Sequence, residues 1–210
     1  FICNTSQDED KEISYFKSLD AKMVDGIICI MGSEDIPTTY LNRDIPVVCI
    51  DREPKEKSDA YYVESNHYDG GYQATNELIQ RGCKNIVFLS RNKPTSATRQ
   101  RFYGYLDALK ENHLKYQEEL NVTIDANLHN YEGARSAIDS IIKKGIRFDG
   151  IFATNDWRAY GALVALKDNY IQVPQQIKII GFDDIFISSM SIPTLSTIHQ
   201  DTENLAYTAC

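Results

Sequence analysis

The motifs that mark common classes of enzyme are missing from this chain of 210 residues. It contains no GxGxxG or GxxxxGKS/T loop for a phosphate, no GxSxG nucleophile elbow and no HExxH zinc motif. The 4 histidines stand in unrelated contexts and form no catalytic set. We therefore expect no cofactor, no metal site and no enzymatic activity.

The chain also lacks an excess of basic residues. Lys and Arg number 22 against 30 Asp and Glu, which gives a formal net charge of −8. Because a surface that follows a phosphate backbone needs clustered positive charge, we expect no nucleic-acid binding by this segment itself. No apolar run approaches the roughly 18 residues of a membrane span.

Cysteine is sparse and follows no ligand pattern: the 5 residues form no CxxC and no zinc-finger spacing. Three of them, Cys3, Cys29 and Cys49, stand inside apolar runs, so we expect small buried side chains in a reducing, cytoplasmic compartment. The chain starts within an expected strand, without a signal-like leader, and stops within an expected helix, which we interpret as a fragment.

What the chain does have is a regular alternation of short apolar runs and helical periodicity. This alternation is typical of βαβ units and parallel sheets that are covered on both faces. Small residues at helical spacing, such as Gly71 and Ala74, predict close packing of a helix on a sheet. Strands are expected at 1–3, 25–30, 46–50, 60–64, 85–89, 120–124, 150–154 and 177–182, and helices at 8–22, 69–82, 98–112, 131–144 and 156–168.

Polar residues follow five of these expected strands, namely Asn4, Asp51, Ser65, Asn155 and Asp183. One such residue alone would more often cap a helix or begin a turn. Because ligands of open α/β sheets bind beyond the carboxyl ends of the strands, five together predict a cleft that is lined with hydrogen-bonding groups.

The residue types of this cleft favour a ligand that is rich in hydroxyl groups. Carboxylates such as Asp51 and Asp183 accept hydrogen bonds, the amide of Asn155 both donates and accepts, and Arg101 adds a planar donor. We therefore predict a neutral sugar or a close relative as the ligand.

Seven blocks of the sequence resemble, in order, the effector-binding core of the LacI/GalR family of bacterial transcription regulators. The pairing of a strand-ending GFDD with a following PTLSTIHQ is the most specific of these features. The blocks are VDGIICI, IPVVCIDREP, SNHYDGGYQATNELIQRGCKNIVFLS, RQRFYGYLDAL, FDGIFATNDWRAYGALVAL, VPQQIKIIGFDDI and IPTLSTIHQD.

The resemblance implies an α/β fold of the periplasmic-binding-protein type, with two lobes that are each a mostly parallel sheet flanked by helices. Residues 1–65 plus 200–210 would form the N-terminal lobe, truncated at both chain ends, and residues 66–199 the C-terminal lobe. The effector would lie in the cleft between them. The resemblance further implies a homodimer that binds operator DNA only through a helix-turn-helix headpiece, which this chain lacks.

The resemblance also implies an effector site. Its usual contacts match Asp51, Arg101, Asn155 and Asp183, and contacts of some members match Ser65 and Gln200. The full expected set is Asp51, Arg101, Asn155, Asp183, Ser65, Gln200, Thr5, Asp8 and Leu128.

One position departs from the family pattern. Where members present an aromatic platform to the ligand, this chain has Leu128, with His129 beside it. Trp157 and Tyr131 are candidate substitutes, although aromatic residues at helix starts more often serve packing.

Two other functions remain open from the sequence. A periplasmic sugar-binding receptor of a transporter would share the fold and the ligand class. A cytoplasmic sugar-processing enzyme would instead use Asp51 and Asp183 as an acid and base pair. An upstream leader peptide would favour the receptor, and an upstream helix-turn-helix would exclude it.

Overall fold

The computed structural model describes residues 1–6, 8–30, 32, 35–54, 60–125 and 127–210. The chain forms two compact units. The first comprises Phe1–Ser65, Thr95–Ala97 and Asp201–Cys210, and the second comprises Asn66–Pro94 and Thr98–Gln200. None of the helices within these described ranges is long and apolar enough to cross a membrane.

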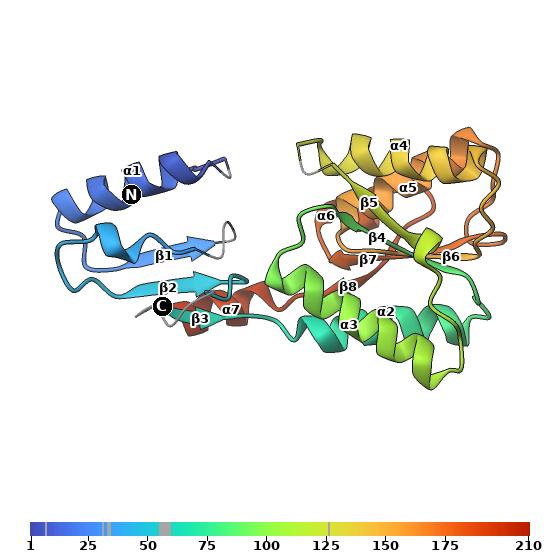
Figure 1. Ribbon diagram of the computed structural model, residues 1–210, viewed down its shortest axis with the longest axis horizontal. Coiled ribbons are helices and arrows are strands. Elements are labelled where there is room, and N and C mark those ends of the chain that lie inside the picture. Colours follow the sequence, from blue (N-terminus) through green and yellow to red (C-terminus); the bar gives the residue numbers. More distant parts are fainter. Residues whose placement is uncertain (7, 31, 33–34, 55–59, 126) are drawn as a thin grey trace. The chain divides into compact units, whose positions relative to one another are not determined.

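The first unit is built on a three-stranded parallel sheet in the order β1-β2-β3 (Figure 1). Helix α1 buries Phe16 against Ile27, Cys29, Val47 and Cys49, the alternate residues of β1 and β2. Helix α7 contacts β2 and β3. The elements are α1 (Glu9–Ala21), β1 (Ile27–Ile30), η1 (Thr38–Tyr40), β2 (Val47–Ile50), β3 (Tyr61–Val63) and α7 (Thr202–Ala209).

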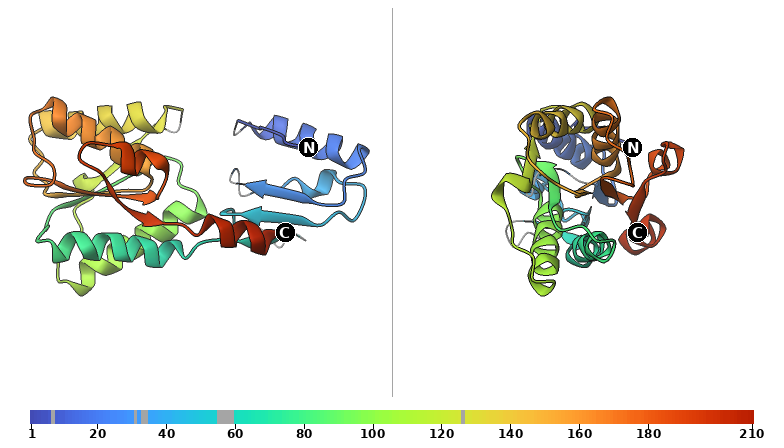
Figure 2. Two further views of the ribbon diagram at one scale, coloured as in Figure 1. Left: turned by 180° about the vertical axis from the view of Figure 1, so that it is seen from behind. Right: turned by 90° about the vertical axis from the view of Figure 1, so that its right-hand side faces the viewer.

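The second unit contains a five-stranded parallel sheet in the order β5-β4-β6-β7-β8. Helices α2 and α3 cover one face and α4 and α5 the other (Figures 1 and 2). The elements are α2 (His67–Gln80), β4 (Ile86–Arg91), α3 (Ser96–Glu111), η2 (Glu118–Leu120), β5 (Asn121–Ile124), α4 (Asn130–Lys143), β6 (Gly150–Ala153), α5 (Asp156–Asp168), β7 (Lys178–Asp183), α6 (Phe186–Met190) and β8 (Ser196–His199).

The central strands of this sheet carry apolar residues on both faces because both faces are buried. In β4, Val87 and Leu89 pack with the α4 and α5 layer, whereas Ile86 and Phe88 pack with the α2 and α3 layer. This alternation follows the two-residue period of a strand. The predicted class of parallel sheets flanked by helices is confirmed.

Two glycines allow α2 and α3 to approach each other closely. A Cβ added at Gly71 would lie 2.2 Å from the carbonyl oxygen of Arg101, and one at Gly104 would lie 2.1 Å from that of Tyr68. The expectation that Gly71 faces the sheet is therefore wrong. The small residue is needed where two helix backbones cross, and its neighbour Gly70 packs on Phe182 of β7 instead.

Several local expectations from the sequence are wrong. Residues 1–3 form no strand. Phe1 and Ile2 are 85% and 102% exposed, and Cys3, which was expected to be buried, is exposed as well. Asn4 thus follows no strand. Helix α6 and strand β8 were not expected as elements. Cys29 and Cys49 are buried, as predicted.

Candidate functional site

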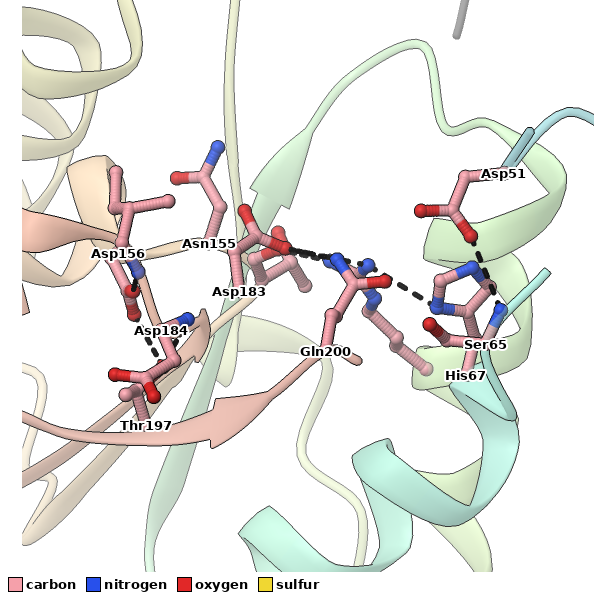
Figure 3. Close-up of polar contacts among 12 residues, drawn as sticks. Asp51, Ser65, His67, Asn155, Asp156, Asp183, Asp184, Thr197 and Gln200 are labelled. Atoms are coloured by element: carbon pink, nitrogen blue, oxygen red, sulfur yellow. Dashed lines mark hydrogen bonds and ion pairs between the residues drawn. The ribbon is translucent and has the colours of Figure 1, made fainter. Parts of the chain in front are cut away.

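The carboxyl edge of the five-stranded sheet gathers the polar residues that follow β4, β6 and β7. Because these strands are parallel, their carboxyl ends share one edge. Asp183 ends β7, and Thr154 and Asn155 follow β6. Figure 3 shows Asn155, Asp183 and Gln200 near one another at this edge.

Arg101 is buried at this edge, with only 7% of the residue exposed, and several contacts fix its side chain. Its Nη1 donates to the carbonyl oxygen of Thr154 at 2.6 Å, and its Nη2 lies 3.2 Å from Nδ1 of His67. The guanidinium carbon lies 3.5 Å from the ring centre of Phe182. These contacts fix a planar donor beside Asp183, whose Oδ1 is 3.7 Å from Nη2.

Asp183 occupies an uncommon backbone conformation. Its φ is 104° and that of Asp184 is 55°, in a region that side chains other than glycine rarely adopt. Gln200 donates from Nε2 to Oδ1 of Asp183 at 2.7 Å (Figure 3). Because such strain costs about 1–3 kcal/mol and persists mainly at functional positions, it marks Asp183 as a candidate binding residue.

Asn155 serves as the N-cap of α5, since its Oδ1 accepts from the backbone N–H of Arg158 at 2.9 Å. Asn155 therefore caps a helix, as a single polar residue after a strand more often does. The cap uses the carbonyl oxygen and leaves the amide nitrogen as a donor.

Asp156 is fully buried and ties three elements together. Its Oδ1 accepts from the hydroxyl of Thr197 at 2.6 Å, and its Oδ2 accepts from the backbone N–H of Ile185 at 2.9 Å (Figure 3). Burial is the main cause that raises the pKa of Asp156 to about 6, and the charges of Asp183 and Asp184 add to it. Asp156 thus holds α5 against β8 and the segment after β7, which carries Asp184.

Arg158 and Arg91 also belong to this edge, and no sequence pattern predicted them as site residues. Arg158 is 6% exposed, and its Nη1 donates to the hydroxyl of Thr154 at 2.6 Å. Burial is the largest cause that lowers its pKa to about 9, followed by the charges of Arg91 and Arg101. The edge therefore has a side rich in arginine near β4 and a side rich in carboxylate near β7.

Asp51 and Ser65 form a separate contact in the first unit. The backbone N–H of Ser65 donates to Oδ1 of Asp51 at 3.2 Å, and Asp51 has a φ of 52° (Figure 3). Asp8 caps α1 by accepting from the backbone N–H of Lys11, while its own N–H donates to the carbonyl oxygen of Thr5. Thr5 and Asp8 therefore lie together at the start of α1.

The aromatic substitutes considered for Leu128 pack against neighbours. Trp157 contacts Phe186 edge to face with ring centres 6.0 Å apart, and Tyr131 stacks on Tyr160 at 5.6 Å. Leu128 is 48% exposed, and its carbonyl oxygen accepts from Arg91 at 3.5 Å. Leu128 therefore lies next to the arginine-rich side of the edge.

In the portion of the chain with described coordinates, no three His, Cys, Asp or Glu side chains are grouped so that they could hold a metal ion.

Comparison with known proteins places the chain among bacterial regulators. Residues 75–210 match the family described as periplasmic binding protein-like domain. The HTH-type transcriptional regulator RegA of Clostridium saccharobutylicum is 31% identical over 99% of this chain and 62% of its own length. The HTH-type transcriptional repressor PurR of Vibrio atlanticus is 36% identical over 95% of this chain and 59% of its own length.

A solved structure extends the likeness over the whole chain. The periplasmic binding protein/LacI transcriptional regulator from Alkaliphilus metalliredigens QYMF, complexed with D-xylulofuranose, is 31% identical, with a TM-score of 0.79. The match covers 100% of this chain and 75% of that one. The chain spans about three fifths of the length of the curated relatives it matches.

Proposed function

Since the chain belongs to the LacI/GalR family of transcription regulators, we propose that it is the effector-binding core of such a regulator and senses a small sugar or sugar-like molecule. The proposal extends to effector contacts from both units, namely Asp51, Ser65, Thr5 and Asp8 of the first and Arg101, Asn155, Asp183, Gln200 and Leu128 of the second.

The observation that carries this proposal is the arrangement around Asp183. A carboxylate in a strained conformation accepts from Gln200 and lies beside the fixed guanidinium of Arg101. Vicinal hydroxyls each donate and accept, so adjacent acceptor and donor groups satisfy them in pairs. The relative that was solved with D-xylulofuranose supports a ligand of this class.

In the whole protein, effector binding would act on DNA. We propose that the protein is a cytoplasmic homodimer and that closure of the two units on the effector changes the spacing of two DNA-binding headpieces. A ligand shifts such an equilibrium only by the difference in its affinity for the two states, so contacts from both units are required. No enzymatic step is part of this proposal.

A thermal-shift screen of pentoses, hexoses and their acid and phosphate derivatives tests the binding function. A ligand at about 100 times its dissociation constant stabilises the folded state by about 2.7 kcal/mol, which is readily measured. We expect at least one sugar or sugar derivative to raise the unfolding temperature. No shift with any of them at 10 mM would refute the proposed function.

X-ray scattering of the complete protein tests the mechanism. We expect a dimeric mass and a change of the scattering curve on addition of the sugar found in the screen. A monomeric mass, or identical curves together with unchanged operator affinity, would exclude regulation by closure.

A further inference from the structure

Arg158 is a buried cation that forms no ion pair with a carboxylate of the described residues. It is 6% exposed, and its Nε is buried with no hydrogen-bond partner. Its side chain makes one hydrogen bond, from Nη1 to Thr154. Among the residues whose positions are described, no carboxylate lies within ion-pair distance of it. Because a buried charge is expensive unless it is paired, this arrangement is unfavourable in the unliganded protein.

Two further features add to that cost. Arg158 stands in the first turn of α5, where the positive end of the helix dipole disfavours a cation. Its lowered pKa also reflects the nearby charges of Arg91 and Arg101 after the larger effect of burial, and the charge of Asp183 opposes these effects only in part. An apolar residue would fit a buried position next to Ala159 and Ala162 at lower cost.

The three arginines converge on one small region. Arg101 and Arg158 both donate to Thr154, to its carbonyl oxygen and its hydroxyl at 2.6 Å each, so their guanidinium groups are held close together. Arg91 ends β4, the strand whose Leu89 accepts the backbone N–H of Thr154 at 3.0 Å. Donors with positive charge therefore surround the carboxyl ends of β4 and β6.

The carboxylates of the same edge are engaged elsewhere. Asp183 pairs with Arg101 and accepts from Gln200, and Asp156 accepts from Thr197 and Ile185. Asp184 contacts Nδ1 of His199 at 3.0 Å. None of these carboxylates forms an ion pair with Arg158, and the charge of Asp183 leaves its pKa lowered to about 9.

We infer that the effector carries an anionic group, a carboxylate or a phosphate, which binds at Arg158 with Arg91 and Arg101 around it, while its hydroxyls bind on the side of Asp183 and Asn155. The effector class would then be an acidic sugar or a sugar phosphate. The inference rests on the proposed function and narrows it, and it replaces the neutral sugar that the residue types alone predict.

The test compares acidic and neutral probes on the protein and on Arg158→Met. D-Gluconate and D-glucuronate represent carboxylates, ribose 5-phosphate and glucose 6-phosphate represent phosphates, and D-ribose and D-glucose are their neutral counterparts. Inorganic phosphate alone tests for a site that needs no sugar. Arg147→Met, which removes an exposed arginine of the same unit, is the matched control.

We expect one acidic probe to bind more tightly than its neutral counterpart and to lose about tenfold to a hundredfold in affinity in Arg158→Met, the range for one hydrogen bond to a charged group. Its affinity should be unchanged in Arg147→Met. In the absence of probe, Arg158→Met should unfold at a higher temperature than the parent, because the uncompensated charge is gone.

Other results would overturn the inference. Equal binding of acidic and neutral probes, or unchanged acidic-probe affinity in Arg158→Met, would remove it and leave the proposed function standing. A lowered unfolding temperature of Arg158→Met without probe would show a purely structural arginine. Binding of inorganic phosphate as tight as that of a sugar phosphate would reject a sugar-linked anion. Absence of binding by every probe would remove both the inference and the proposed function.

Discussion

The buried carboxyl group of Asp156 makes a specific prediction about stability and pH. Its pKa is raised from an ordinary 3.8 to about 6, mainly by burial. Below about pH 4 the group is protonated in both the folded and the unfolded chain. As the pH rises from about 4 to about 6, the unfolded chain releases this proton first, so the folded state loses stability. The shift corresponds to at most about 3 kcal/mol.

Asp156→Asn removes this titration and keeps the shape of the side chain. Its amide can donate to the hydroxyl of Thr197 while its oxygen accepts from Ile185, so both contacts survive. We expect the stability of the parent relative to Asp156→Asn to fall by about 2–3 kcal/mol between pH 4 and pH 7.5. Glu132→Gln, which removes an exposed carboxylate in α4, is the control.

Urea unfolding, followed by the fluorescence of the single tryptophan, Trp157, is a suitable assay because that residue adjoins Asp156. Because the parent and Asp156→Asn are compared at each pH, the contributions of all other titrating groups to the stability cancel. A stability difference that stays constant from pH 4 to pH 7.5, or one that changes in the opposite direction, would refute the reasoning.

Four further substitutions test the helix crossing, the Arg52 ion pair and the role of Arg101. Gly104→Ala should destabilise the second unit by at least about 2 kcal/mol in urea unfolding, because the added Cβ would lie 2.1 Å from a carbonyl oxygen of α2. Gly82→Ala is the control: its φ is 92°, but an added Cβ would meet no atom within 4 Å, so we expect a loss of stability of only about 1 kcal/mol. Equal losses of stability in the two variants would contradict the close approach of α2 and α3 at Gly104. Arg52→Lys should cost about 2–3 kcal/mol, because the buried fork of Arg52 reaches both carboxylate oxygens of Glu12; an unchanged urea midpoint would show that the fork is dispensable. Arg101→Lys should weaken effector binding in calorimetry because the planar fork is lost, and equal affinity would exclude a bidentate contact.

Much of the fold was predictable because both faces of the larger sheet are buried. Residues 150–154 and 177–182 read as apolar runs, and β6 and β7 lie there. The error at residues 1–3 has the same origin, since an apolar run does not reveal whether a partner strand is present. Strand β8 was missed because Ser196 and His199 interrupt its apolar pattern.

The candidate site was predictable only in part. Polar residues after strands led to Asp183 and Asn155 because the position of a strand end can be read from the sequence. The position of Arg158 depends on the direction of a side chain across α5 toward Thr154, and helical periodicity does not encode that contact. The crossing at Gly71 likewise depends on tertiary packing between helices.

Calorimetric titration of Asp183→Ala tests the central claim most directly. The titrant is the sugar or sugar derivative that gives the largest thermal shift with the parent chain. Removal of this carboxylate takes away the acceptor for paired hydroxyls, so we expect a loss of about 1.5–3 kcal/mol of binding free energy, or roughly tenfold to a hundredfold in affinity. Asp168→Ala, at an exposed carboxylate in the same unit, should bind as the parent does. An affinity of Asp183→Ala equal to that of the parent would contradict an effector site at the carboxyl edge of this sheet.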